Sequence, residues 1–256
     1  MADTWDPAQY GRFRAERSTP FFDLVGLVRP PAGARVADLG CGTAELTRTL
    51  LDAWPVAEIL AVDASAAMLA SAPRDDARLH TLPADIGALG DVGTFDVIVA
   101  NASLHWVPDH ARVLTDWTTR LRPHGQLAVQ VPANGDHPAH RLAAALGHEW
   151  FGGSCPPDPV LTNVLPPEQY AVLLHELGYA HQLVRLQVYG HTLPSTDAVV
   201  EWVKGTTLTR FRTVASPEEF DRFVDEYRQR LMAELGDRRP YFYPFKRILF
   251  WARRPG

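Results

Sequence analysis

Three acidic residues follow predicted strands at positions that could bring them to one ligand. Asp38 lies in the turn Asp38-Leu-Gly-Cys-Gly42, Asp63 closes the next apolar run, and Asp85 follows a third. Gly40 and Gly42 tolerate positive φ and let a ligand approach the backbone closely. A carboxylate beside such a turn suits a cationic or zwitterionic ligand that carries a free amine.

The residue at position 45 argues against a nicotinamide cofactor. A dinucleotide fingerprint, G-x-G-x-x-G/A, would place Gly or Ala there, but the chain has Glu45. A pyrophosphate would sit at the N-terminus of the helix that follows the turn, and a carboxylate at that place would repel it.

The spacing of the other two acidic residues indicates which ligand this turn binds. Asp63 lies 21 residues beyond Gly42, where a carboxylate can accept hydrogen bonds from two ribose hydroxyls. Asp85 could accept from an adenine amino group. A ligand with ribose, adenine and an amine but no phosphate is S-adenosyl-L-methionine. The alternative is that each Asp merely caps the helix that follows it.

Strand-like and helix-like runs alternate from residue 35 to about residue 132, which predicts an α/β fold with a parallel sheet. In such sheets ligands gather at the carboxyl ends of the strands. We therefore expect Asp38, Asp63, Asp85 and Asn101 along one edge, with His105 and Trp106 nearby. The predicted strands are 35–39, 58–62, 78–82, 95–100, 125–131, 182–190 and 247–252, and the main predicted helices are 44–54, 138–151, 167–177, 196–204 and 217–235.

Ordered motifs along the first half of the chain resemble those of class I S-adenosyl-L-methionine-dependent methyltransferases. They are Asp38–Gly42, Val62–Leu69, Ala84–Ile86 and Asn101–Trp106; Ala44 stands where the family commonly has a third glycine. The resemblance implies a Rossmann-like fold with a mostly parallel seven-stranded sheet, an antiparallel last strand, a helical N-terminal lid and a helical cap. The cofactor-binding residues that it implies are Asp38, Gly40, Gly42, Asp63, Ala64, Met68, Asp85, Ile86 and Asn101.

A closer resemblance, to the trans-aconitate 2-methyltransferase group, extends along nearly the whole length. The segments that carry it include Trp5–Tyr10, Asn101–His110, Leu127–Pro132 and Phe245–Arg254. It implies esterification of one carboxylate of a small polycarboxylate such as trans-aconitate, with S-adenosyl-L-homocysteine as the other product. A carboxylate acceptor is already ionised at neutral pH, so this reaction requires no general base, and no catalytic residue is assigned.

The remaining carboxylates of such an acceptor would be held by arginines, whose planar fork matches a carboxylate. Of the candidates Arg14, Arg17, Arg210, Arg212, Lys246 and Arg247 we favour Arg17 and Arg210. The resembled group carries its arginine directly after the leucine that aligns with Leu208, whereas Thr209 intervenes here. The predicted acceptor-binding residues are Tyr10, Arg17, His105, Trp106, Arg210 and Tyr241.

The pattern of elements also predicts how the chain is organised within a single methyltransferase domain. Residues 1–30 would form a helical lid and residues 31–132 the cofactor-binding core. Insertions at 133–165 and 192–244 would form the helical cap, while 166–191 and 245–256 complete the sheet. The sequence Ser216-Pro-Glu-Glu219 predicts the start of a capped helix within the second insertion.

Composition excludes several classes of function. The chain has 25 basic and 30 acidic residues in mixed order, and its formal net charge of -5 offers no basic stripe for nucleic acid. No apolar run approaches the length of a membrane span. Cys41 and Cys155 form no C-x-x-C pair, and no His and acid cluster has metal-ligand spacing, so we expect no disulfide framework and no metal. We expect a cytoplasmic monomer or weak dimer.

Two other functions stay open at this point. The chain could methylate another small acid, or a natural-product hydroxyl or amine, which would require a general base such as His105. Alternatively, it could bind S-adenosyl-L-methionine as a sensor without turnover.

Overall fold

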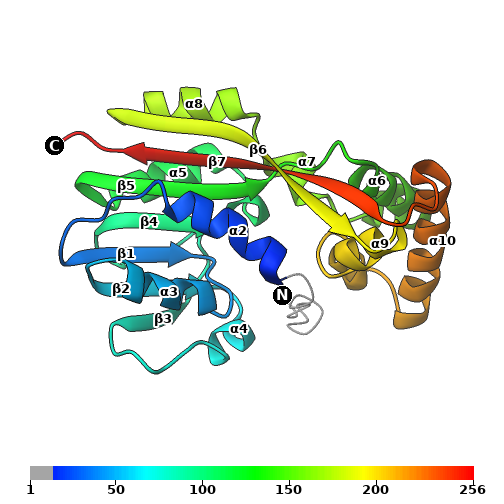
Figure 1. The fold of residues 1–256 in the computed structure, drawn as a ribbon, viewed down its shortest axis with the longest axis horizontal. Coiled ribbons are helices and arrows are strands. Elements are labelled where there is room, and N and C mark those ends of the chain that lie inside the picture. Colours follow the sequence, from blue (N-terminus) through cyan, green and yellow to red (C-terminus); the bar gives the residue numbers. More distant parts are fainter. Residues whose placement is uncertain (1–13) are drawn as a thin grey trace. The chain divides into compact units, whose positions relative to one another are not determined.

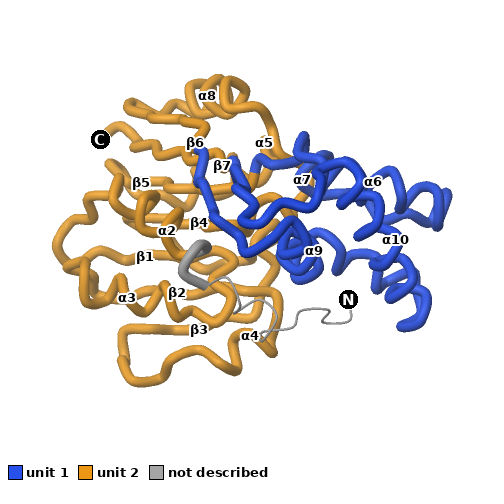
Figure 2. The backbone as a smooth tube through the Cα atoms, turned by 45° about the vertical axis from the view of Figure 1, so that its right-hand side comes forward, with its two compact units in different colours: residues 1–16, 133–162, 188–246 blue, residues 17–132, 163–187, 247–256 orange. Residues whose placement is uncertain are grey.

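The computed structural model describes residues 14–256, with side chains from residue 18 onward. The chain divides into two compact units, which are described separately below (Figure 2). The ranges of unit 1 overlap the two segments predicted as a cap, and its role as a cap stays a prediction. Unit 2 comprises residues 17–132, 163–187 and 247–256, and unit 1 comprises residues 1–16, 133–162 and 188–246.

Within the described residues, seven strands form one sheet in the order β3-β2-β1-β4-β5-β7-β6 (Figure 1). The first five strands pair in parallel, and β7 runs antiparallel to β5. This topology confirms the predicted class I methyltransferase fold. The strands are β1 Ala34–Leu39, β2 Val56–Asp63, β3 Leu79–Pro83, β4 Phe95–Asn101, β5 Leu121–Pro132, β6 His181–Leu193 and β7 Tyr241–Arg253.

The helices α3, α4 and α5 of unit 2 lie between its parallel strands, in line with the predicted alternation. Short α4 and longer α5 fill connections that the periodicity alone did not single out. The helices that lie in unit 2 or begin at its boundary are α2 Arg14–Val25, α3 Glu45–Ala53, α4 Ala66–Ala70, η1 Leu104–Trp106, α5 His110–Thr119 and α8 Pro167–Glu176.

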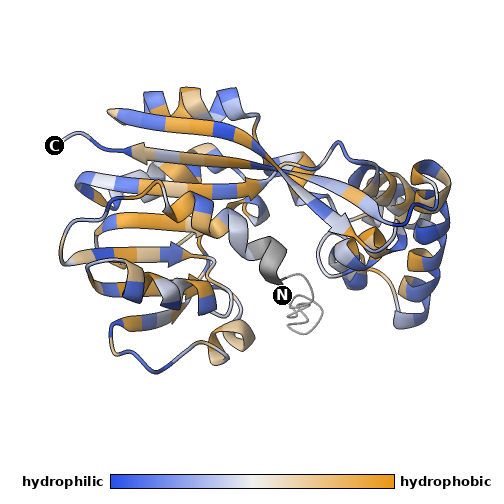
Figure 3. Cartoon of the chain, viewed as in Figure 1, coloured by the Kyte–Doolittle hydropathy of each residue, from blue (hydrophilic) through white to orange (hydrophobic). Residues whose placement is uncertain are grey.

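Apolar strands build the core of unit 2. Val36, Ile59, Val97, Val99 and Leu127 are fully buried, and β4 and β5 are hydrophobic along much of their length (Figure 3). Strands that are buried on both faces read as continuous apolar runs, which is why the sequence located them well.

Two strands, β5 and β7, begin well before their predicted starts. β5 begins at Leu121, which pairs with Phe95, and the register then shifts across the segment that contains Pro123 and Gly125. These two residues suggest a turn, so the sequence predicts a later start. β7 begins at Tyr241 with buried aromatic side chains that alternate as in a strand. Pro244 lies within this segment, so the sequence predicts a later start. Proline carries no N–H for the sheet, so it misleads a prediction that rests on residue type.

Helices surround a separate aromatic core in unit 1. Phe211 and Phe223 have ring centroids 4.5 Å apart, and Tyr227 and Tyr243 are fully buried in the same cluster. The helices of unit 1, of which α7 ends at the boundary with unit 2, are α6 Pro138–Phe151, η2 Gly152–Ser154, α7 Pro159–Asn163, α9 Asp197–Lys204, η3 Thr209–Thr213 and α10 Pro217–Leu235.

The start of α10 agrees with its sequence signal. The Ser216 hydroxyl accepts from the backbone N–H of Glu219 at 3.2 Å, and the Glu219 carboxylate accepts from the backbone N–H of Ser216 at 2.9 Å. With Pro217 in the first turn, this is the predicted capping box. It satisfies two backbone donors that the helix itself leaves without partners.

Candidate functional site

The turn between β1 and α3 has a backbone that only small residues permit. Gly40 and Gly42 have φ of +81° and +59°, and Ala44 follows at +54°. A Cβ atom at Gly40 would lie 2.1 Å from the Cβ of Ser103, so this position requires glycine for two reasons. The backbone N–H groups of Gly40 and Cys41 both donate to the Val62 carbonyl, at 2.7 and 3.0 Å, which ties the turn to β2.

Asp63 joins this turn to the end of β2. Its Oδ2 accepts the backbone N–H of Gly42 at 2.8 Å, and its Oδ1 accepts the backbone N–H of Ser65 at 2.9 Å. The side chain is half-buried. Because each carboxylate oxygen has two lone-pair positions, both oxygens can accept a further hydrogen bond from a ligand. The geometry therefore suits a pair of neighbouring hydroxyl groups.

Asp38 lies on β1, almost completely buried with 3% of its surface exposed. The Thr47 hydroxyl donates to its Oδ2 at 2.5 Å. The pKa of Asp38 is raised to about 6. Burial is the largest cause, the Thr47 hydrogen bond acts in the opposite direction, and the charge of Asp63 adds to the increase. A cation at this position would favour the ionised carboxylate, so the site suits the amine that the sequence predicts.

Asp85 and its neighbours follow β3. The Asp85 carboxylate is exposed and accepts the backbone N–H of Gly87 at 2.8 Å, while Ile86 beside it is buried. The Ala84 N–H donates to the Asp63 carbonyl at 3.1 Å, which holds this loop to the end of β2. Two further predicted residues, exposed Ala64 and buried Met68, lie where β2 passes into α4.

Strand register places several of these side chains on one face of the sheet. Asp38 pairs with Ala61 of β2 and with Val99 of β4. Paired residues share a face, and so do residues two apart on one strand. Asp63 and Asn101 therefore lie on the face of Asp38, at the carboxyl edge of the sheet. The Oδ1 atom of Asn101 is buried and has no hydrogen-bond partner among the described residues.

The loop after β4 contains the predicted residues His105 and Trp106. His105 is 6% exposed, although it lies in a loop, whereas Trp106 is 41% exposed. Their ring centroids are 4.7 Å apart, and the His105 carbonyl accepts from Asn163 Nδ2 at 2.9 Å. The Ser103 hydroxyl donates to the Leu39 carbonyl at 2.5 Å, so the loop is fixed against the end of β1.

Arg210 lies in unit 1 and already has a buried partner. Its Nη1 donates to Asp158 Oδ2 at 2.9 Å and to the Thr207 carbonyl at 3.0 Å. His140 Nδ1 lies 3.3 Å from the same Asp158 oxygen. Burial raises the pKa of Asp158, but His140 and Arg210 together bring that pKa down to about 2. Arg210 thus has an internal carboxylate partner at Nη1, and its predicted contact with an acceptor carboxylate stays a prediction.

Of the other predicted acceptor-binding residues, the structure describes Tyr241 but not Tyr10 or the side chain of Arg17. Tyr241 is buried in unit 1, and its hydroxyl lies 3.3 Å from His137 Nε2. Burial is the main cause that lowers the pKa of His137 to about 4. Tyr10 and the side chain of Arg17 lie outside the described residues. The acceptor-binding assignments therefore stay predictions.

Comparison with known proteins assigns the chain to a family. A model of the methyltransferase domain matches residues 10–183. The trans-aconitate 2-methyltransferase of Deinococcus radiodurans is 42% identical over 98% of this chain and 99% of its own length. That of Streptomyces coelicolor is 38% identical over 99% of this chain and 88% of its own length. The chain belongs to the trans-aconitate 2-methyltransferase family.

A solved structure of a methyltransferase shares the fold of this family member. Phosphoethanolamine N-methyltransferase 2 of Haemonchus contortus, in complex with S-adenosyl-L-methionine, superimposes with a TM-score of 0.59 and 16% identity. The match covers 93% of this chain and 53% of that longer chain. At this identity the likeness concerns the fold alone.

The surroundings of both cysteines disfavour the thiolate form. Burial, followed by the charges of Asp38 and Asp63, raises the pKa of the Cys41 thiol far above its usual range. Cys155 in unit 1 also has a pKa raised by burial, although the charge of Arg210 opposes this.

Within residues 18–256, no group of three His, Cys, Asp or Glu side chains is arranged to hold a metal ion. The described helices include none that is long and apolar enough to cross a membrane.

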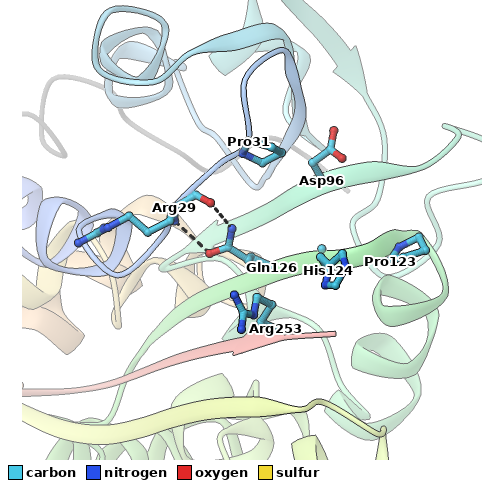
Figure 4. A pocket seen from close by; sticks show the side chains of 8 residues that line it. Arg29, Pro31, Asp96, Pro123, His124, Gln126 and Arg253 are labelled. Atoms are coloured by element: carbon cyan, nitrogen blue, oxygen red, sulfur yellow. Dashed lines mark hydrogen bonds between the residues drawn. The ribbon is translucent and has the colours of Figure 1, made fainter. Parts of the chain in front are cut away.

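A pocket of about 170 Å³ lies at the other edge of the sheet in unit 2 (Figure 4). Asp96 and Gln126 line it near the starts of the paired segments of β4 and β5, so it is remote from the carboxyl ends of these strands. Gln126 exchanges two hydrogen bonds with the backbone of Arg29, at 2.6 and 3.0 Å. These bonds attach the segment after α2 to the sheet, and we assign the pocket no part in methyl transfer.

Sequence reasoning missed three residues that shape the site. Thr47 bonds Asp38, Ser103 packs against Gly40, and Gln130 is a fully buried amide in β5. Only Gln130 carries a signal in the sequence, since it is a polar residue inside the apolar run Leu127–Pro132. The contacts of Thr47 and Ser103 depend on packing between elements, which no local pattern reveals.

Proposed function

We propose that this chain transfers a methyl group from S-adenosyl-L-methionine to one carboxylate of trans-aconitate, releasing the monomethyl ester and S-adenosyl-L-homocysteine. The observation that carries the proposal is the arrangement of Asp63, whose two oxygens are held by the backbone of the glycine turn and of Ser65. The names of the Deinococcus and Streptomyces relatives support the acceptor.

The residues at the carboxyl edge fit this cofactor. Asp63 would accept hydrogen bonds from the ribose hydroxyls, Asp85 from the adenine amino group, and Asp38 would face the amine. Gly40 and Gly42 add no side chain at their positions in the turn. The buried Oδ1 of Asn101 has no partner among the described residues and would accept a hydrogen bond from the ligand. The remaining cofactor-binding residues of the proposal, which are Ala64, Met68 and Ile86, would provide apolar contacts.

The acceptor determines which chemistry the protein must provide. Bound S-adenosyl-L-methionine supplies a methyl group on a positively charged sulfonium. A carboxylic acid with a pKa of about 4 is ionised at neutral pH, so the protein need not remove a proton. Its task is to align the acceptor oxygen and to exclude water, which would stabilise the separated charges of the reactants. Buried His105 and neighbouring Trp106 would help to orient the acceptor, without acting as a base.

The proposal also covers the state of the protein in the cell. The even mixture of 25 basic and 30 acidic residues supports a cytoplasmic monomer or weak dimer whose partner is a small polycarboxylate, without nucleic acid or membrane. Light scattering over a range of protein concentrations would test the oligomeric state. A dimer mass that does not change with protein concentration would contradict a monomer or weak dimer.

The reaction is tested by incubating the protein with S-adenosyl-L-methionine and a panel of acids, and by identifying esters with mass spectrometry. The panel contains trans-aconitate, cis-aconitate, citrate and isopropylmalate. We expect a single monomethyl ester, formed fastest from trans-aconitate. Preferred turnover of a hydroxyl or amine acceptor would favour an enzyme that uses His105 as a base. Tight binding of S-adenosyl-L-homocysteine without any turnover would favour a sensor.

A further inference from the structure

Two polar side chains, Gln130 on β5 and Arg247 on β7, meet inside unit 2. Gln130 is completely buried and Arg247 is 5% exposed. Arg247 Nη1 donates to Gln130 Oε1 at 3.1 Å. β5 and β7 run side by side in the sheet (Figure 1), so the pair bridges two neighbouring strands. A buried positive charge thus lies against a neutral amide in the interior of the sheet unit.

Strand register places this pair beside the proposed cofactor site. Gln130 is the Cα partner of Asn101, and Arg247 is the Cα partner of Pro132, two residues beyond Gln130. By the rule that paired residues share a face, Gln130 and Arg247 lie on the face that carries Asp38 and Asn101. Both are near the carboxyl end of β5, which is the edge where α/β sheets bind their ligands.

The amide of Gln130 is incompletely satisfied. Its Nε2 is buried and has no hydrogen-bond partner among the described residues, as is also true of Asn101 Oδ1. A buried donor without a partner is costly, and native proteins retain such groups mainly where a ligand or water binds. Leucine would fill the same space within this apolar strand without leaving a polar group. The amide nitrogen therefore points to a ligand that accepts hydrogen bonds.

We propose that Gln130 Nε2 and the Arg247 guanidinium bind a carboxylate of the acceptor that does not react. This inference rests on the proposed function and names the residues that would make the enzyme specific for polycarboxylates. The guanidinium matches a carboxylate through parallel N–H donors, and Gln130 adds a donor while holding the guanidinium by its own Oε1.

Substitution of the pair separates this role from a structural one. Arg247→Met is expected to raise the KM for trans-aconitate by roughly 10- to 100-fold, the range for the loss of a charge-assisted contact, with a smaller change in kcat. Calorimetry should show the same loss in the affinity of trans-aconitate for protein saturated with S-adenosyl-L-homocysteine. Affinity for S-adenosyl-L-homocysteine should stay within about twofold, and Arg247→Lys should restore part of the acceptor affinity.

The matched control is Arg253→Met, which removes an exposed arginine from the same strand at the other edge of the sheet. It should leave the KM for trans-aconitate, kcat and both affinities unchanged. If Arg247→Met does not fold, Gln130→Glu keeps the inference testable, because the new carboxylate would pair with Arg247 and compete with the acceptor. That variant should bind trans-aconitate at least roughly 10-fold more weakly without a lower melting temperature.

The outcomes distinguish this inference from the proposed function. Normal acceptor KM and affinity in Arg247→Met and Gln130→Glu would overturn the assignment of the pair, while ester formation by the wild type would leave the function in place. Wild-type protein that binds trans-aconitate but forms no ester would overturn the function, and the calorimetric comparison would still decide the role of the pair. Wild-type protein that binds none of the polycarboxylates would overturn both.

Discussion

The carboxyl edge of unit 2 and the buried charge cluster of unit 1 hold their acidic groups in opposite ways. Asp63 is held by backbone N–H groups, at 2.8 and 2.9 Å, and its oxygens keep positions for a ligand. Asp158 Oδ1 also accepts a backbone N–H, that of Val160 at 3.0 Å, but its Oδ2 is held by the side chains of Arg210 and His140, so its charge is neutralised within the chain. Under the proposed function, the carboxylate of Asp63 serves recognition, whereas the charge-paired carboxylate of Asp158 serves the fold.

The largest effect should come from breaking the cluster of unit 1. Asp158→Ala leaves the Arg210 charge buried without its carboxylate, which should lower the free energy of unfolding by about 3 to 5 kcal/mol. Urea denaturation measures this loss. As a control, Glu234→Ala breaks the exposed Arg141–Glu234 pair of the same unit and should cost less than about 1 kcal/mol. Equal losses in the two variants would show that the cluster does not serve the fold.

Removal of the backbone-held carboxylate should instead weaken ligand binding. Asp63→Ala deletes the acceptor of the Gly42 and Ser65 N–H groups and of the ligand hydroxyls. Affinity for S-adenosyl-L-homocysteine should fall by about 1 to 3 kcal/mol in calorimetry. Asp75→Ala, which changes an exposed carboxylate in the same unit, should have no effect. Unchanged affinity in Asp63→Ala would contradict the role of this carboxylate.

The pKa of Asp38, which burial raises to about 6, makes cofactor binding depend on pH. A cationic amine requires the ionised carboxylate, so affinity for S-adenosyl-L-homocysteine should be full above about pH 7 and roughly tenfold weaker at about pH 5. Without ligand, the free energy of unfolding depends on pH with the opposite sign. The folded pKa exceeds the ordinary value of 3.8, so this group adds stability as pH falls from about 6 to about 4. Asp38→Asn should flatten both profiles, and a persistent tenfold change would assign the titration to another group.

The smallest effect concerns Ala44, which adopts a positive φ of 54° before α3. Ala44→Gly should raise the free energy of unfolding by roughly 0.5 to 1 kcal/mol, because the left-handed conformation is strained for residues with a Cβ. Ala145→Gly, at an exposed position inside α6 of unit 1, should lower it by about 1 kcal/mol. Destabilisation by both substitutions would show that the conformation of Ala44 stores no strain.

Local patterns in the sequence predict the fold better than they predict contacts between distant side chains. The apolar strands, the glycine turn and the capping box of α10 depend on neighbouring residues, and the structure contains each of them. The Arg210–Asp158 pair joins residues 52 positions apart, and the Gln130–Arg247 pair joins residues 117 positions apart. Single-sequence periodicity carries no information on which distant side chains meet. The burial of His105 was equally hidden, since it depends on how its loop packs.

The central claim is that the carboxyl edge of unit 2 binds S-adenosyl-L-methionine for transfer to an acid. The most direct test follows a carbon-13 label from the methyl group of S-adenosyl-L-methionine into trans-aconitate by mass spectrometry, with wild-type protein and Asp63→Ala. We predict one labelled methyl group per product molecule for the wild type, and a rate at least roughly tenfold lower for the variant at limiting cofactor. Absence of labelled ester with every acid, or an equal rate in the variant, would contradict the claim.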